Sequence, residues 1–454
     1  MSPSETIQEH DETSSQQMSF ADALQLALRL HQSNQFDYAE DIYRQLLAVA
    51  PEHPDLLHFF GFLRHQRGYA EEGIEFIKKA LAIVPEYIDA HNNLGNIYLQ
   101  TGQPDLAEPC FRRVLELNAD FSSAYGNLGI ALKEKARFHE AVTFLLKAID
   151  LEPHASHHYQ NLANVYRHLK NYESAVELYR KTIAMNPHDS NAYRKLCMTF
   201  YAMREQEQCL EVLKDWLKHE PENAIAQHLW SSYTHDSIPA RASDAYVRQT
   251  FDGFAASFDG VLKRLDYQAP FLVQNALQQV RPDPETWHLL DAGCGTGLCG
   301  ALVRGSVKHL VGVDLSPKML ERAQVRGVYD ELLEAELTEF LLRHKSSYDV
   351  ITCVDTLCYF GDLSAVFYAV AKALKVNGWF IFTLEKLIAT DQKEHFHLHQ
   401  HGRYSHTEDY VTGLLVAAGF QVCTMDSAVL RTESREPVLG MVVTAQVQPV
   451  MGGN

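Results

Sequence analysis

The sequence predicts two parts of different fold class: an all-α solenoid of helical repeats and, after it, a doubly wound α/β domain that ends in an antiparallel hairpin. Three observations support this prediction. Prolines and small residues recur every 34 residues in the first half, apolar strand-like runs alternate with helix-like stretches from residue 287, and the last two apolar runs have no helix between them. A chain of 454 residues is too long to pack around one ordinary hydrophobic core, so several domains are expected.

The composition argues against some classes of function. With a net charge of −18 we expect no nucleic-acid partner, because binding to phosphates needs clustered Lys and Arg. No apolar run has the roughly 18 residues of a membrane-spanning helix, and residues 1–19, expected to be flexible, lack the features of a signal peptide. We therefore expect a cytoplasmic protein without a membrane partner and with reduced cysteines. The sequence does not indicate an oligomeric state.

The first predicted element is the repeat array, over residues 20–223. Prolines recur at multiples of 34 residues, and each is expected to end a helix, because its ring removes an amide donor and clashes with the preceding turn. These are Pro51, Pro85, Pro153, Pro187 and Pro221. Small residues such as Gly61, Gly95 and Gly129 recur at another phase, where two helices must approach closely.

This pattern resembles the tetratricopeptide repeat, in six units, with residues 224–243 expected as a capping helix and linker. The resemblance implies a groove that holds a protein or peptide. Asn93, Asn127 and Asn161 share one phase of the central repeats. Their carboxamides can pair with a peptide backbone, similar to the asparagine ladder of the O-linked N-acetylglucosamine transferase. The alternative is that asparagine only suits the contact between helices.

The second part begins with residues 244–286, which predict two amphipathic helices. Phe251, Phe254 and Phe258 share a face there, either as core packing or as a lid over a cofactor. From residue 287, strands are predicted at 287–292, 308–314, 348–354 and 378–385, and a closing hairpin at 420–430 and 437–447. Strands that alternate with helices predict a parallel sheet with helices on both faces.

The turn after the first of these strands predicts a cofactor site. Gly293, Gly295 and Gly297 remove the side chains that would keep a ligand away from the backbone. Such a turn suits a dinucleotide as well as S-adenosylmethionine, and Asp314 suits the adenosine ribose of either. Asp291 favours S-adenosylmethionine over a dinucleotide, because a carboxylate repels a pyrophosphate but favours the α-ammonium group of a methionine moiety.

Residues 287–449 form the last predicted domain, and they resemble the class I S-adenosylmethionine-dependent methyltransferases. The resemblance lies in "LLDAGCGTG", "VGVDLS", "YDVITCVDTLCYF" and "ALKVNGWFIFTLE". The chain as a whole is similar to a bacterial family of methyltransferases with tetratricopeptide repeats. These resemblances imply a Rossmann-like seven-stranded sheet and S-adenosylmethionine as cofactor. The cofactor-binding residues implied are Asp291, Ala292, Gly293, Gly295, Gly297, Asp314, Leu315, Met319, Glu336, Leu337 and Val354. Glu336 stands where the family usually has Asp.

The sequence indicates less clearly which residues contact the acceptor of the methyl group, here called the acceptor side. Asp355 and Tyr359 follow the fourth predicted strand, where this fold commonly places acceptor-facing residues, although Asp355 can equally cap a helix. In the stretch "EHFHLHQHGRYSH", His406 is a candidate base, and Arg403 and Tyr404 are candidate substrate contacts. Histidines at every second position of this stretch suggest a metal, but no cysteine or acidic cluster completes the set, so no metal site is expected.

Three hypotheses of function follow. The first is a methyltransferase whose repeats recruit a protein or peptide. The second is a methyltransferase of a small metabolite, with the repeats used for assembly or regulation. The third is a non-catalytic scaffold that binds S-adenosylmethionine.

Overall fold

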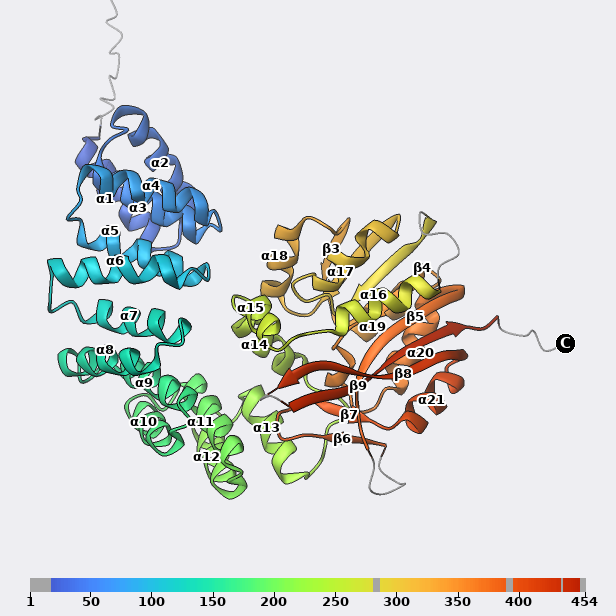
Figure 1. The fold of residues 1–454 in the computed structure, drawn as a ribbon. Helices are drawn as coiled ribbons and strands as arrows, with labels where there is room; N and C mark the ends of the chain where they lie inside the picture. The colour runs from blue at the N-terminus through green and yellow to red at the C-terminus, as the bar shows by residue number, and fades with distance from the viewer. Residues whose placement is uncertain (1–17, 281–285, 389–394, 434–435, 450–454) are drawn as a thin grey trace, which may run out of the picture. The chain divides into compact units, whose positions relative to one another are not determined.

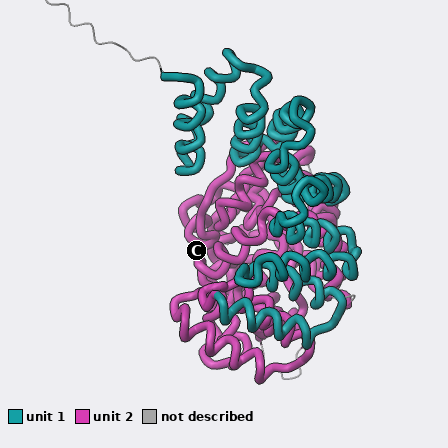
Figure 2. Tube along the Cα trace, turned by 90° about the vertical axis from the view of Figure 1, so that its left-hand side faces the viewer, with its two compact units in different colours: residues 1–185 teal, residues 186–454 magenta. Residues whose placement is uncertain are grey.

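The computed structural model describes residues 18–280, 286–388, 395–433 and 436–449. Most of the predicted N-terminal segment, residues 1–17, lies outside these ranges. The chain divides into two units, residues 1–185 and 186–454, coloured separately in Figure 2.

The first unit is all-helical and consists of helix pairs (Figure 1). Its helices are α1 (Phe20–Gln32), α2 (Phe36–Val49), α3 (Pro54–Gln66), α4 (Ala70–Ile83), α5 (Ile88–Gln100), α6 (Pro104–Leu117), α7 (Ser122–Glu134), α8 (Phe138–Leu151), α9 (Ser156–His168) and α10 (Tyr172–Met185). Two helices fill each 34-residue period, as the sequence predicts.

The small residues of the repeat lie where paired helices touch. A Cβ atom on Gly61 would come within 2.8 Å of the carbonyl oxygen of Gly73, and one on Gly129 within 2.5 Å of Leu145 Cγ. The prolines stand just beyond the second helix of a pair, since α2 ends at Val49 before Pro51 and α8 ends at Leu151 before Pro153. Helix spacing and helix ends therefore both follow from the repeat.

The second unit begins with helices. These are α11 (Ser190–Met203), α12 (Gln206–His219), α13 (Ala224–Thr234), α14 (Asp244–Phe254), α15 (Phe258–Arg264) and α16 (Ala269–Gln279). The sixth helix pair and the predicted capping helix α13 thus belong to the unit that contains the sheet. The two helices predicted for 244–286 are three, because the chain turns at residues 255–257 and again at 265–268.

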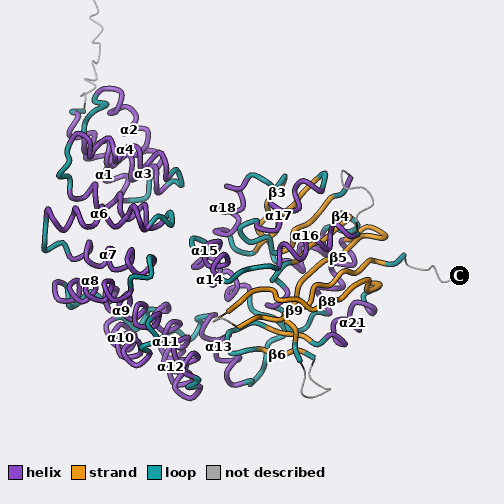
Figure 3. The backbone as a smooth tube through the Cα atoms, in the orientation of Figure 1, coloured by secondary structure: helices purple, strands orange, loops and turns teal. Residues whose placement is uncertain are grey.

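From β1 to β5 the strands alternate with helices along the chain, and Figure 3 colours the two kinds of element separately. The strands are β1 (His288–Ala292), β2 (His309–Asp314), β3 (Glu331–Glu334), β4 (Tyr348–Cys353), β5 (Leu374–Lys386), β6 (Phe396–Leu398), β7 (Tyr404–His406), β8 (Phe420–Glu433) and β9 (Glu436–Val447). The helices are α17 (Leu298–Val303), α18 (Pro317–Arg326), α19 (Leu337–Arg343), α20 (Ser364–Ala373) and α21 (Glu408–Ala417), with 3-10 turns η2 (Arg304–Ser306) and η3 (Leu357–Tyr359).

One mixed sheet contains all the described strands. Strands β3, β2, β1, β4 and β5 are parallel in that order, and β9 pairs antiparallel with both β5 and β8. The sequence predicts six of these seven strands by range, all but β3, and the resemblance to the methyltransferases implies a sheet of seven. The short β6–β7 hairpin is an addition, since β7 pairs with β5 at Glu385 and Lys386.

The sheet is covered on both faces. Successive residues of a strand point to opposite faces, and Leu289 joins a core with α16 and α17, whereas Leu290 joins a core with α19, α20 and α21. The parallel strands therefore end together at one edge, where ligands bind in folds of this kind.

Two expectations from composition concern the whole chain. The eight cysteines are free thiols, of which Cys423 alone is exposed. Among the residues that the structure describes, no helix has the length and apolar character needed to cross a bilayer.

Candidate functional site

A pocket lies at the edge of the sheet where β1 to β4 end. Its walls come from the loops after these strands and from the helices that precede β1. The pocket is lined by Arg241, Ala242, Val247, Phe251, Phe258, Tyr267, Gly293, Gly295, Val313, Asp314, Leu315, Ala335, Glu336, Leu337, Val354, Asp355, Thr356, Tyr359 and Phe360.

The glycine turn after β1 forms the floor of this pocket. Gly293, Gly295 and Gly297 have φ angles of +74°, +54° and +87°, which residues with a Cβ atom rarely adopt. A Cβ atom on Gly293 would also lie 2.1 Å from Thr356 Oγ1. Gly293 and Gly295 both line the pocket, so a ligand there lies directly against the main chain.

Asp314 at the end of β2 faces the same pocket. Its two carboxylate oxygens accept hydrogen bonds from the backbone amides of Gly295 and Ser316, each at 2.8 Å. Burial raises the pKa of Asp314, and these amides oppose that rise. The carboxylate thus ties the glycine turn to the next loop and stands where the hydroxyl groups of a ribose can bind.

The loop after β3 brings Glu336 and Leu337 to the pocket. Glu336 caps α19, because its carboxylate accepts the backbone N–H of Glu339 at 2.8 Å. Its other carboxylate oxygen lies 3.9 Å from Arg241, which also lines the pocket. Glu336 therefore has a structural role besides any contact with a ligand.

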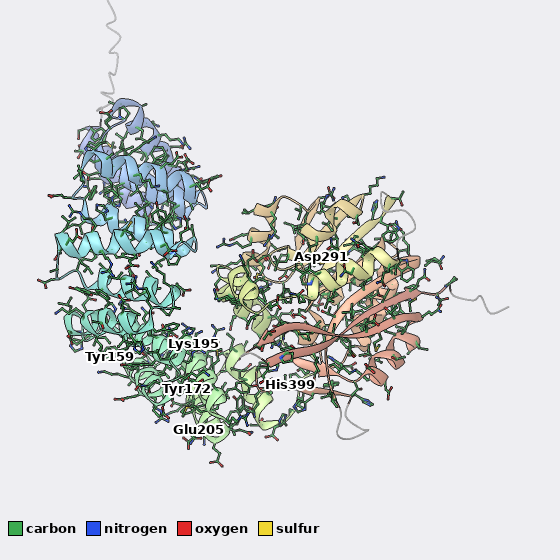
Figure 4. The ribbon with its side chains drawn as sticks, in the orientation of Figure 1. Tyr159, Tyr172, Lys195, Glu205, Asp291 and His399 are labelled. Carbon is green, nitrogen blue, oxygen red and sulfur yellow. The ribbon has the colours of Figure 1, made fainter. Side chains whose placement is uncertain are left out.

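Asp291 stands apart from the pocket, because its carboxylate is inside the α/β fold (Figure 4). It is 1% exposed and accepts a hydrogen bond from the Tyr329 hydroxyl at 2.7 Å. Burial raises its pKa to about 6. Among the predicted cofactor residues, Ala292, Gly297 and Met319 are likewise absent from the pocket wall; Met319 is 1% exposed within α18.

Asp355 and Tyr359, predicted for the acceptor side, both line the pocket. Asp355 has a left-handed backbone with φ +51°, a conformation that non-glycine residues keep mainly at functional sites and tight turns. It caps no helix. Its carboxylate accepts a hydrogen bond from the Arg431 guanidinium at 2.9 Å, and its amide donates to Thr383 Oγ1 at 2.9 Å.

Arg431 connects Asp355 to a buried ion network. Arg431 is 3% exposed and also pairs with Glu385 and, at 2.7 Å, with Glu433. Burial raises the pKa of Asp355, whereas the positive charge of Arg431 opposes that rise. The network fixes the carboxylate of Asp355 at the wall of the pocket, since both of its partners come from the sheet.

The remaining wall is aromatic, and sequence reasoning missed part of it. Tyr267, between α15 and α16, lines the pocket together with Phe360 and Val247. Burial holds the pKa of Tyr267 well above its usual value, and the nearby carboxylate of Asp355 adds to that rise. The only sequence signal was the aromatic stripe before it, of which Phe251 and Phe258 reach the pocket.

The other acceptor-side predictions fall away from the pocket. His406 is fully buried in β7 and its Nε2 atom lies 3.0 Å from the carbonyl oxygen of Gly361. Burial lowers its pKa to about 4, so it is a poor base. Tyr404 is fully buried and donates to the carbonyl of Pro239 at 2.8 Å, and Arg403 pairs with Glu433 at 2.6 Å. These three residues support the loop rather than face a ligand.

The histidine stretch forms the β6–β7 hairpin. Rings of His397 and His399 lie 4.7 Å apart, and those of His399 and His401 5.0 Å apart; His399 is labelled in Figure 4. In the described part of the chain, the one grouping of three metal-ligand side chains is Glu152, His157 and His158 of the first unit. The histidine stretch contributes none of them.

The asparagine row lies on α5, α7 and α9 of the first unit. Asn93 Nδ2 lies 2.8 Å from Nε2 of His58, whose Nδ1 contacts the Tyr87 hydroxyl at 3.1 Å. Asn127 Nδ2 donates to Asn96 Oδ1 at 2.8 Å. The nitrogen atoms of both carboxamides thus have partners within the array, and the oxygen atoms are the groups left to accept hydrogen bonds.

Family models match both parts of the chain. The methyltransferase domain model matches residues 290–382. Tetratricopeptide repeat models match residues 88–121, 122–154 and 158–189.

Similar proteins of established description match the second part. The ubiquinone biosynthesis O-methyltransferase of Hydrogenovibrio crunogenus is 30% identical over 105 residues, which are 22% of this chain and 43% of that protein. Human methyltransferase-like protein 27 is 37% identical over 110 residues, 24% of this chain and 45% of that protein. The chain therefore spans less than half the length of these relatives.

Solved structures align with the helical repeats. The crystal structure of MamA is 25% identical, covers 36% of this chain and 96% of its own, and has a TM-score of 0.34. YrrB, described as a tetratricopeptide-repeat protein with an unusual peptide-binding site, is 22% identical, covers 41% of this chain and 92% of its own, and has a TM-score of 0.35. On the family matches and the fold, the chain joins tetratricopeptide repeats to a methyltransferase domain.

Proposed function

We propose that the protein is an S-adenosylmethionine-dependent methyltransferase whose repeats recruit a protein or peptide. The observation that supports this most is the single pocket wall shared by the glycine turn, by Asp314 and by Asp355. One side of the wall suits an adenosine-containing donor, and the other side carries an acid and aromatic rings for an acceptor.

The residues present fit the proposed cofactor. The bare main chain at Gly293 and Gly295 leaves room for the methionine end, and Asp314 can accept the hydroxyl groups of the ribose. Glu336, Leu337 and Val354 complete the wall at the adenine end. When bound, this cofactor would supply the methyl group of its sulfonium to an acceptor in line, with the thioether S-adenosylhomocysteine as the leaving group.

The acceptor side would act mainly by positioning and by excluding water. Alignment and desolvation can supply most of the rate of such a displacement. The aromatic rings of Phe251, Phe258 and Tyr359 exclude water from the pocket, and the fixed carboxylate of Asp355 orients an amine or hydroxyl group. An acceptor that loses a proton also needs a base, and Asp355 is the acceptor-side carboxylate of the wall, whose pKa is raised by burial.

The repeats are proposed to hold an extended peptide. The Nδ2 atoms of Asn93 and Asn127 have partners within the array, so we assign the carboxamide oxygens the role of accepting backbone amides of a peptide of any sequence. A small aromatic acceptor is the second candidate. It is favoured by the aromatic wall and by relatives whose names describe ubiquinone biosynthesis O-methyltransferases.

Labelled methyl transfer tests these alternatives. Lysate from cells that lack the protein is incubated with the full chain and methyl-labelled S-adenosylmethionine, and label is measured in macromolecules and in small molecules. The first proposal predicts label in protein that falls when Asn93 and Asn127 are changed to Ala, with Asn118→Ala as a control outside the row. Label confined to small molecules supports the second candidate, and binding of the cofactor without any transfer supports a scaffold.

A further inference from the structure

The segment that precedes the pocket contains the same three residues twice. Phe251-Asp252-Gly253 recurs seven residues later as Phe258-Asp259-Gly260. In both copies the phenylalanine lines the pocket, and in both copies the aspartate bonds to a loop of the cofactor site. Figure 1 shows the helices that carry them, α14 and α15, beside the sheet domain.

Asp252 binds the loop after β2. Its Oδ1 atom accepts the hydroxyl of Ser316 at 2.6 Å and lies 3.4 Å from the amide of Lys318. Ser316 caps α18, and its own amide donates to Asp314 at 2.8 Å. Asp252 is thus linked through Ser316 to Asp314, the carboxylate proposed to hold the ribose.

Asp259 binds the glycine turn. Its Oδ1 atom accepts the hydroxyl of Thr296 at 2.5 Å, and its Oδ2 atom pairs with Arg326. Arg326 in turn donates to the carbonyl oxygen of Thr296 at 2.5 Å. Thr296 is 2% exposed and stands between two of the three glycines, so this pair attaches α15 directly to the floor of the pocket.

Apolar burial alone holds these helices weakly. Tyr246 is the only buried side chain within α14, and Leu262 the only one within α15. Phe251 and Phe258 are only partly covered, with their ring centroids 6.2 Å apart. Segments with few buried apolar contacts open at low free-energy cost, so polar contacts help to keep this segment closed. Besides the two aspartates, Arg248 of α14 donates to Glu334 at 2.9 Å and to the carbonyl oxygen of Leu315 at 3.3 Å.

We propose that Asp252 and Asp259 are positioning residues that latch α14 and α15 over the pocket and so retain the cofactor under Phe251 and Phe258. The proposal rests on the proposed function, because the retained ligand is S-adenosylmethionine or its product. The two latches hold the same two loops that the ligand itself bridges. Ligand binding and lid closure therefore stabilise each other. Phe258 Cε1, 3.9 Å from a Cβ atom built on Gly295, presents a ring near the methionine end, where a sulfonium gains from an aromatic face.

The test measures ligand release and lid opening separately in the full chain. Asp252→Asn and Asp259→Asn are compared with Asp266→Asn, a matched change at an exposed residue beyond α15 whose carboxylate accepts a hydrogen bond from Gln268 at 2.7 Å. The dissociation rate of labelled S-adenosylhomocysteine is expected to rise at least tenfold in either latch variant and to stay unchanged in the control. Thermal unfolding without ligand shows whether the rest of the fold is retained.

Hydrogen exchange without ligand provides the second readout. Amides of residues 251–265 are expected to exchange at least tenfold faster in the latch variants, whereas those of β1 and β2 keep their rates. Unchanged exchange in the lid overturns the latch. Faster exchange with an unchanged dissociation rate overturns its role in ligand retention. If the unmodified chain fails to bind S-adenosylhomocysteine, both the proposed function and the role of the lid in ligand retention are wrong. Hydrogen exchange still tests separately whether Asp252 and Asp259 hold the lid closed.

Discussion

Two carboxylates of the cofactor motifs, the buried Asp291 and the partly exposed Asp314, have different roles. Both were predicted from the sequence as ligand contacts, but only Asp314 lines the pocket. Asp291 bonds to Tyr329, 38 residues further on. No local pattern indicates this partner, because the contact forms only when β1 and the loop before β3 pack together.

Titration of Asp291 should make the free energy of unfolding depend on pH. Burial raises its pKa to about 6 in the folded state, against roughly 3.9 when unfolded. The stability it contributes is thus fully present below pH 4 and is lost as the pH rises through 6. Relative to Asp291→Asn, the unmodified chain should lose about 3 kcal/mol between pH 4 and 7, by the equivalence of one pKa unit to about 1.4 kcal/mol. Urea unfolding at several pH values measures this, and a constant difference between the two proteins would refute it.

Asp314 is expected to determine affinity for the cofactor. Asp314→Asn removes the charge that is proposed to accept the ribose hydroxyls, and a hydrogen bond to a charged group contributes roughly 1.5–3 kcal/mol. The affinity for S-adenosylhomocysteine should fall at least tenfold by calorimetry. Asp426→Asn, an exposed change in β8, is the control and should leave the affinity unchanged. Equal affinities in both variants would show that Asp314 does not bind the cofactor.

At the scale of helices and strands, the sequence predicted the elements that repeat or alternate along the chain. The helix pairs, four of the five parallel strands in the row from β3 to β5, and the closing hairpin were predicted, because periodicity and turn residues are local signals. The break between α14 and α15 and the β6–β7 hairpin were not. The hairpin depends on a distant partner, since β7 pairs with the end of β5 and Tyr404 donates to Pro239.

The β6–β7 hairpin gives a prediction at this scale. Gly402 has φ +86°, its carbonyl oxygen lies 2.9 Å from His228 of α13, and a Cβ atom there would lie 2.5 Å from the Tyr246 hydroxyl. Gly419 has φ +90° but open space around it. Gly419→Ala should therefore cost only the backbone strain of roughly 1–3 kcal/mol, and Gly402→Ala should cost a further 1–3 kcal/mol, roughly, for the steric overlap. Equal losses of unfolding free energy would show that the hairpin does not pack against α14.

At the scale of the whole molecule, the sixth helix pair and α13 belong with the sheet domain. Ala240 accepts the amides of Gly361 and Asp362, each at 2.8 Å, and Ala242 donates to the carbonyl oxygen of Tyr359 at 2.8 Å. The predicted linker is thus bonded to the loop that carries an acceptor-side residue. The sequence predicted a linker within residues 224–243 because the repeat pattern ends there, but loss of a pattern does not show where packing ends.

Two truncations test this division of the chain. A chain of residues 186–454 should keep the thermal stability of the sheet domain, whereas residues 237–454 should unfold at a temperature several degrees lower. The shorter chain lacks α13, so Tyr246 and the Gly402 turn lose their cover. Thermal unfolding of the two chains measures the difference, and equal midpoints would show that α13 is not part of the domain.

The central claim, that the pocket holds S-adenosylmethionine, is tested most directly by calorimetry of the full chain with S-adenosylhomocysteine. The glycine turn and Asp314 predict one binding site per chain, occupied by S-adenosylmethionine as well and weakened by Asp314→Asn. Absence of binding by both ligands would contradict the claim.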